Sequence, residues 1–356
     1  MNTTLLRVPF LCWFAILCLA GPVAARAADA PALAVVSHSL TSTVLRDTRT
    51  DLDPVRQIKV ILPPSYASSG KSCPVVYLCH SIFQSPEQML ADGKILRLLQ
   101  RGFAAGKTAE FIVVIGDYSS PSTGSLYENS PATGRWLDHT VEELVPFIDR
   151  TYRTLRGAES RALVGEMMGG GGALLIAMRH PDVFSVAYAL NPVRTGTGLL
   201  PVQWYPNWEK IHAAKSFADL GGEHISQIFV TMSQAFLPNP NRPPFYCDFL
   251  MDKRDGQLVY HPENARKLVA GFAIVEIADH YADNLRRLRA VALDWARYDP
   301  VQDHVYGSAA LSRKLDLLGV EHEAEEYRGV YWHENWREHG RFDARVLPFL
   351  ARHLVF

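Results

Sequence analysis

The stretch Val164–Phe184, which reads VGEMMGGGGALLIAMRHPDVF, constrains the fold of this chain more than any other segment. The apolar residues that lead to Glu166 are typical of a buried strand, and the apolar run after the glycines is typical of a helix. Four consecutive glycines, Gly169 to Gly172, begin that helix, although each glycine in a helix interior costs about 1 kcal/mol relative to alanine. The sequence therefore predicts a tight strand–turn–helix unit whose backbone lies close to neighbouring segments.

Short apolar runs alternate with helical patterns along most of the chain. Residues 30–60 alternate polar and apolar side chains, which favours an antiparallel hairpin. Later runs have the composition of buried strands: Cys73–His80, Phe111–Asp117, Arg161–Glu166 and Arg289–Ala296. Helical periodicity lies between them, so we expect an α/β fold with a mostly parallel sheet and helices on both faces. Residues 192–287 are too many for a simple loop and predict a lid or cap insertion over the carboxyl edge of the sheet.

The composition is that of an ordinary globular protein. The chain has 356 residues, of which 48% are hydrophobic and 21% charged, with a formal net charge of -1. Such a chain can bury a large core, and its small net charge gives no reason to expect nucleic acid or an anionic membrane as a partner. We expect a small-molecule substrate or ligand, and the sequence does not fix the oligomeric state.

The first residues have the pattern of a secretory signal peptide. Arg7 precedes the apolar run Val8–Ala20, and small residues follow up to Ala25-Arg26-Ala27. We therefore expect residues 1–27 to be removed and residues 28–356 to form one exported domain, periplasmic or secreted. The apolar run is too short for a stable membrane span; a retained anchor is the alternative.

Three cysteines remain beyond the signal pattern, Cys73, Cys79 and Cys247. Their number permits at most one disulfide, and the sequence does not determine which pair would form it. No cysteine or histidine cluster has the spacing of a zinc site. We expect neither a metal nor another cofactor.

The strand–turn–helix unit has the glycines of a nucleophile elbow. Gly165, Met167 and Gly169 occupy the two glycine positions and the apex of the G-x-S-x-G pattern. A thioether has no proton to lose, so a histidine cannot convert Met167 into an alkoxide or thiolate. Acyl transfer through the apex residue is therefore excluded.

From about Asn129 to its C-terminus, the chain resembles the esterase D-like esterases of the α/β-hydrolase fold, which include small-acyl and feruloyl-type esterases. The segments that carry the likeness are NSPATGRWLDHTVEELVPFIDRTYRT, MMGGGGALLIAMRHPDVFS, PNPNRPPFYCDF, ALDWARYDP and EHEAEEYRG. The resemblance implies an α/β-hydrolase fold with a nucleophile, an acid and a histidine at the carboxyl edge of the sheet.

Compared with the family position by position, this chain has candidates for the acid and the histidine but no serine at the nucleophile position. Asp299 best matches the acid, and His333 best matches the histidine, whereas alignment on Trp336 would put Tyr331 in the histidine position. The nucleophile position holds Met167.

The oxyanion loop also departs from the family pattern. Where the family commonly has His-Gly, this chain has His80-Ser81. Backbone N–H groups of Ile82 and Met168 are the expected oxyanion donors, because such donors need no particular side chain. Ser81 is also the remaining candidate for a relocated nucleophile; the alternative is a structural serine.

Other residues near the expected site have both a functional and a structural interpretation. Glu166 precedes the apex and is either a general base or a solvent-facing elbow residue. Trp332 and Trp204 could line a pocket for an apolar or aromatic ligand, or pack within the loop and the lid.

Two functions from different classes remain open. The first is a diverged enzyme that uses non-covalent acid/base chemistry (lyase, hydratase, isomerase or direct-water hydrolysis), with His333 as the base oriented by Asp299. The second is a non-catalytic pseudo-hydrolase that binds a ligand or partner in the old site. A hydrolase that uses Ser81 is a third reading.

Overall fold

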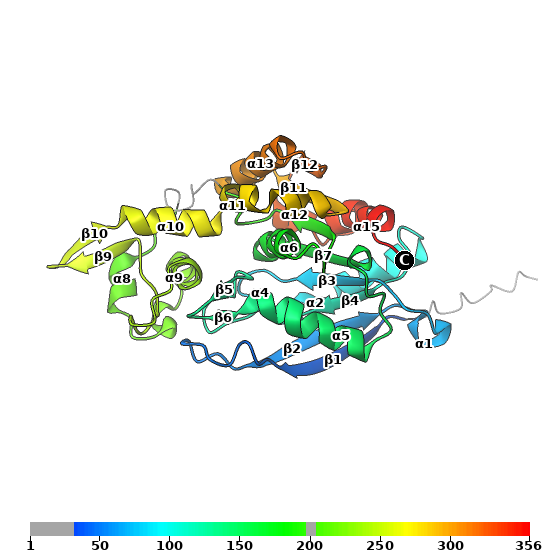
Figure 1. Ribbon diagram of the computed structural model, residues 1–356, viewed down its shortest axis with the longest axis horizontal. Helices are drawn as coiled ribbons and strands as arrows, with labels where there is room; N and C mark the ends of the chain where they lie inside the picture. Colours follow the sequence, from blue (N-terminus) through cyan, green and yellow to red (C-terminus); the bar gives the residue numbers. More distant parts are fainter. Residues whose placement is uncertain (1–31, 197–203) are drawn as a thin grey trace, which may run out of the picture. The chain divides into compact units, whose positions relative to one another are not determined.

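The computed structural model describes residues 32–196 and 204–356, so the predicted signal peptide lies outside the described residues. An eight-stranded sheet in the order β1-β2-β4-β3-β7-β8-β11-β12 forms the centre (Figure 1). The strands are β1 (Ala34–Thr41), β2 (Val55–Leu62), β3 (Val75–Cys79), β4 (Ile112–Ile115), β7 (Arg161–Glu166), β8 (Val186–Leu190), β11 (Ala290–Ala296) and β12 (Glu323–Tyr327). The pairings β1–β2 and β2–β4 are antiparallel, and every later pairing from β4 to β12 is parallel. This confirms the predicted α/β fold with a mostly parallel sheet.

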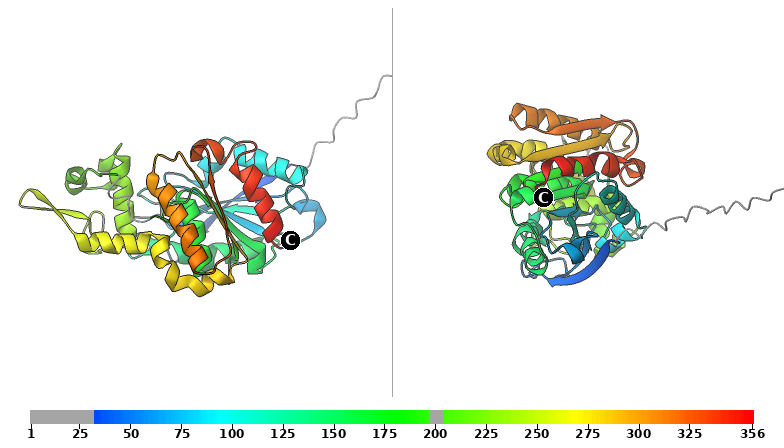
Figure 2. Two further views of the ribbon diagram at one scale, coloured as in Figure 1. Left: turned by 90° about the horizontal axis from the view of Figure 1, so that it is seen from above. Right: turned by 90° about the vertical axis from the view of Figure 1, so that its right-hand side faces the viewer.

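Helices cover both faces of the sheet (Figures 1 and 2). The first half of the chain supplies α1 (Tyr66–Ser69), α2 (Pro86–Leu90), α3 (Lys94–Ala104), α4 (Trp136–Asp138), α5 (Val145–Thr151) and α6 (Met168–Arg179). The second half supplies α8 (Trp208–Ala213), α9 (His224–Phe236), α10 (Pro262–Phe272), α11 (Ile274–Ile277), α12 (Ala282–Arg287), α13 (Gln302–Leu317), α14 (Tyr331–Glu334) and α15 (Leu347–His353).

Alternation along each strand divides the core between the two faces. Val75 and Tyr77 of β3 belong to the cluster that packs under α5 and α6, whereas Val76 and Leu78 belong to the cluster that packs under α3 and α15. Strands that are buried on both faces have continuous apolar sequences. The apolar runs in the sequence therefore predicted these strands.

The glycines that begin α6 allow the close approach predicted from the sequence. A Cβ atom added to Gly169 would lie 2.1 Å from the carbonyl oxygen of Cys79 in β3. A Cβ atom added to Gly171 would lie 2.3 Å from the carbonyl oxygen of Val193, just after β8. Only glycine lets the first turn of α6 pack directly against the ends of these strands.

The long segment between β8 and β11 contains α8 to α12 and a hairpin of β9 (Met251–Arg254) and β10 (Gln257–Tyr260). Part of it has a small core of its own, made of Ile211, Leu220, Val230, Phe245, Cys247 and Phe249. In Figure 1, α8 to α10 lie beyond the end of the sheet, next to the short strands β5 (Asn129–Ser130) and β6 (Gly134–Arg135).

The described residues also bear on disulfides, membrane-spanning helices and metal sites. Cys73, Cys79 and Cys247 are all free thiols, so the disulfide that their number permits is not formed among them. Within residues 32–196 and 204–356, no helix is long and apolar enough to cross a membrane. The same residues contain no group of three or more histidine, cysteine, aspartate or glutamate side chains placed to hold a metal ion.

Candidate active site

Met167 is the apex of a sharp turn between β7 and α6. Its backbone has φ 52° and ψ -116°, a region that non-glycine residues rarely adopt. The turn is held on both sides: the N–H of Met167 donates to Leu190 O at 3.0 Å, and its carbonyl accepts the N–H of Val193 at 3.0 Å. This strained strand-to-helix turn is the backbone geometry of a nucleophile elbow.

The strain at the apex predicts an unusual order of stability among variants. Met167→Gly should be about 1 kcal/mol more stable than Met167→Ala, because glycine relieves about 1–3 kcal/mol of backbone strain and its greater unfolded-state entropy offsets about 0.4–1 kcal/mol. Urea unfolding of the two variants measures the difference. An alanine variant at least as stable as the glycine variant would show that the turn stores no strain.

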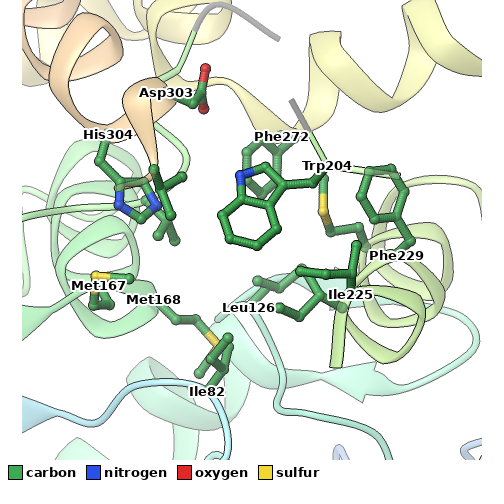
Figure 3. Close-up of a pocket in the computed structure, with 14 residues that line it drawn as sticks. Ile82, Leu126, Met167, Met168, Trp204, Ile225, Phe229, Phe272, Asp303 and His304 are labelled. Atoms are coloured by element: carbon green, nitrogen blue, oxygen red, sulfur yellow. The ribbon is translucent and has the colours of Figure 1, made fainter. Parts of the chain in front are cut away.

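A cavity of about 120 Å³ lies beside the apex (Figure 3). Its 14 lining residues are Ile82, Leu126, Met167, Met168, Val193, Trp204, Ile225, Ile228, Phe229, Met232, Phe272, Val301, Asp303 and His304. All are hydrophobic except Asp303 and His304. The cavity is close in size to an engineered apolar cavity of about 150 Å³ that binds benzene, so it suits a small apolar or aromatic group.

An aspartate–histidine pair borders this cavity. His304 Nδ1 lies 3.0 Å from Asp299 Oδ2, and both side chains are buried. Asp299 Oδ1 accepts the N–H of Val301 at 2.8 Å, which fixes the carboxylate. Because Nδ1 is engaged by Asp299, Nε2 is the ring nitrogen left for chemistry, and His304 lines the cavity together with Met167.

The predicted partnership of Asp299 with His333 is replaced by the pair Asp299–His304. The turn Asp299–Val301 leads directly into α13, so the first turn of that helix brings His304 back onto the carboxylate. His333 instead lies in α14 after β12 and lines a different pocket. The sequence signal for the observed pair is the spacing in DPVQDH, an aspartate followed by a helix start and a histidine.

Tyr331, the alternative for the histidine position, is the first residue of α14. Burial raises the pKa of its hydroxyl to about 12, and the charges of Asp299 and Glu166 contribute to the rise. Both carboxylates are thus close enough to influence the same phenol. Tyr331 lines neither pocket, whereas Trp332 lines the second one.

The predicted oxyanion residues divide into two groups. Ile82 and Met168 line the cavity, as the backbone-donor hypothesis requires. His80 is fully buried, with Nδ1 donating to Ser81 O at 2.9 Å and Nε2 accepting the N–H of Tyr118 at 2.8 Å. Both ring nitrogens are thus engaged by backbone groups, and burial lowers the pKa of His80.

Two further candidates do not line the cavity. Ser81 is buried, its N–H donates to Gln84 Oε1 at 2.9 Å, and it does not line the cavity. Glu166 is also buried and lines the second pocket together with His333. Trp204, in contrast, lines the cavity, in agreement with its functional interpretation as a pocket residue.

Known proteins with similar sequences include esterases. The family model described as "Esterase: Putative esterase" matches residues 50–235. An esterase of Mycobacterium tuberculosis is 29% identical over 174 residues, which are 46% of this chain and 34% of that protein. An endo-1,4-beta-xylanase/feruloyl esterase of Xylanibacter ruminicola is 30% identical over 134 residues, which are 35% of this chain and 18% of that protein. The match spans about a third or less of the length of these curated relatives.

Solved structures agree on the fold. A ferulic acid esterase superposes with a TM-score of 0.61 at 19% identity, covering 91% of this chain and 99% of that one. An S-formylglutathione hydrolase from Agrobacterium tumefaciens superposes with a TM-score of 0.58 at 14% identity, covering 92% and 97%. The central sheet, its flanking helices and the elbow agree with this likeness. The chain therefore belongs to the "Putative esterase" family and has the α/β-hydrolase fold.

Proposed function

We propose that this chain is an exported, diverged member of its family that performs non-covalent acid/base chemistry on a small apolar or aromatic substrate. The observation that carries the proposal is the pair Asp299–His304 at the wall of an apolar cavity beside the elbow. Met167 stands at the apex where the elbow motif carries a serine, and it offers no acidic proton. Export is proposed from the signal pattern of residues 1–27.

In this mechanism His304 acts as the general base. Asp299 holds Nδ1 and orients the ring, so Nε2 accepts a proton from water or from the bound substrate. In direct hydrolysis, the water oxygen bonds to the acyl carbon, the ester C–O bond breaks, and the proton passes from His304 to the leaving alcohol. The N–H groups of Ile82, in the loop after β3, and of Met168, at the positive end of α6, stabilise the negative oxygen. The same base serves elimination if the substrate has an acidic C–H next to a carbon that bears a leaving group: His304 takes the proton, the C–H electron pair forms the double bond, and the leaving group departs and receives the proton from His304.

The proposal is tested with p-nitrophenyl acetate and with a panel of aromatic esters and hydroxy compounds. We expect slow turnover that a fluorophosphonate does not block, because no serine forms an acyl-enzyme. His304→Gln should lower the turnover by about 10²–10⁴-fold, and Asp299→Asn should lower it by misorienting the ring. Fast hydrolysis that a fluorophosphonate abolishes would refute this mechanism, and labelling of Ser81 found by mass spectrometry would revive the relocated nucleophile.

The second candidate is a pseudo-hydrolase that binds a ligand without turnover. The hydrophobic lining of the cavity favours it, because 12 of the 14 lining residues are hydrophobic. Under this alternative, a small aromatic ligand binds equally well to the unchanged protein and to His304→Gln, and no substrate of the panel is converted.

A further inference from the structure

A second pocket lies on the other side of the elbow. It has a volume of about 250 Å³ and shares no lining residue with the first cavity. Its lining residues are Gln84, Gln88, Met89, Asp92, Lys94, Ile95, Glu166, Trp332, His333, Trp336 and Arg337. Glu166 and Met167 are neighbours in the chain, and each lines a different pocket, as consecutive side chains at the end of a strand do.

Glu166 is a buried acidic group that lines this pocket. It is 8% exposed, and its Oε2 accepts an N–H of the Asn335 side chain at 2.9 Å. The Trp336 side chain supplies a second hydrogen bond, and burial raises the pKa of Glu166 against these two donors. Both donors are neutral, so they satisfy oxygen lone pairs without compensating a negative charge.

The other carboxylates and cations that line this pocket have partners of opposite charge. Lys94 Nζ lies 2.7 Å from Asp92 Oδ2, and Arg337 Nη2 lies 2.6 Å from Glu334 Oε2. Within the described parts of the chain, no ion pair involves Glu166. Within the described residues, Glu166 is therefore the carboxylate of this pocket that has no partner of opposite charge.

Two indole rings form walls of the same pocket. Trp332 is 49% exposed, while Trp336 packs on Phe342 with ring centroids 5.0 Å apart. An indole is the side chain that attracts a cation most strongly through its ring face. A carboxylate combined with two indoles is the chemistry that recognises an organic cation.

We propose that the second pocket binds a small organic cation of the substituted-ammonium class. The cationic nitrogen lies close to Glu166, and the alkyl groups pack on Trp332 and Trp336. This site is independent of the proposed chemistry at His304, because the two pockets share no lining residue.

Isothermal titration calorimetry with two probes of the same shape tests the proposal. Choline carries the cation, and 3,3-dimethyl-1-butanol has a carbon in place of the nitrogen. Choline should bind at least tenfold more tightly than the alcohol. Glu166→Gln should reduce that preference several-fold while leaving the affinity for the alcohol unchanged, because the indoles still attract the cation. Trp332→Ala, a change at a half-exposed side chain, should weaken the binding of both probes.

Two matched variants complete the experiment. Glu142→Gln removes an exposed carboxylate elsewhere and should leave choline binding unchanged, as should His304→Gln in the other cavity. The proposal is overturned if choline fails to bind, if the two probes bind equally, or if Glu166→Gln retains the full preference for choline. Unchanged binding by folded Trp332→Ala would also overturn it. Because His304→Gln is assayed for both choline binding and turnover, failure of either proposal is seen separately.

Discussion

Met167→Ser is expected to raise the hydrolysis of p-nitrophenyl acetate by about 10²–10⁴-fold over the unchanged protein. The variant should also become sensitive to a fluorophosphonate. The new hydroxyl would stand at the apex of the elbow, on the wall of the cavity that His304 also lines. His304, oriented by Asp299 at 3.0 Å, could then accept its proton, and the acyl-enzyme excluded by a thioether becomes possible.

Two controls separate this gain from a simple enlargement of the cavity. Met167→Ala frees similar space without a hydroxyl and should show no fluorophosphonate labelling. Met167→Ser combined with His304→Gln should lose the gain, because the serine has no base. If folded Met167→Ser stays inactive and unlabelled, His304 is not placed to accept a proton from residue 167. The hypothesis of a non-catalytic binding protein would then be favoured.

The sequence predicted the scaffold because the scaffold depends on local patterns. Apolar runs predicted the strands β3, β4, β7 and β11. The glycine run predicted a close backbone approach, which is the contact of α6 with the ends of β3 and β8. Those features depend on periodicity and on space for the backbone, which a single sequence displays directly. The family resemblance, and not periodicity, pointed to Asp299, which follows β11.

The histidine could not be fixed in the same way, because its position depends on how two loops fold. After β12 the chain forms α14, which carries His333 to the side of Glu166. The start of α13 brings His304 to Asp299 instead. Likewise, Glu166 and Met167 are adjacent in sequence, and only the three-dimensional structure shows that they line different pockets.

The second large effect is a loss of stability on substitution of Arg194, a fully buried arginine that donates hydrogen bonds to two segments of the cavity wall. Its guanidinium donates to Glu128 Oε2 at 3.0 Å, to Leu126 O at 2.8 Å and to Phe272 O at 3.2 Å. Leu126 and Phe272 line the cavity from different segments. Arg194→Met should lower the free energy of unfolding by about 3–5 kcal/mol, because it leaves buried acceptors without a donor. Urea unfolding followed by circular dichroism measures the loss.

Arg179→Met is the matched control, since Arg179 Nη1 contacts the same carboxylate, Glu128, at 2.6 Å. Its side chain is 23% exposed, so water can replace part of what is lost, and we expect about 1 kcal/mol. If both variants lose the same free energy, the pairing with Glu128 accounts for the whole effect, and the bonds from Arg194 to the two cavity segments contribute nothing. A larger loss for Arg194→Met, together with weaker binding of a small aromatic ligand, would mean that the cavity walls depend on this buried arginine.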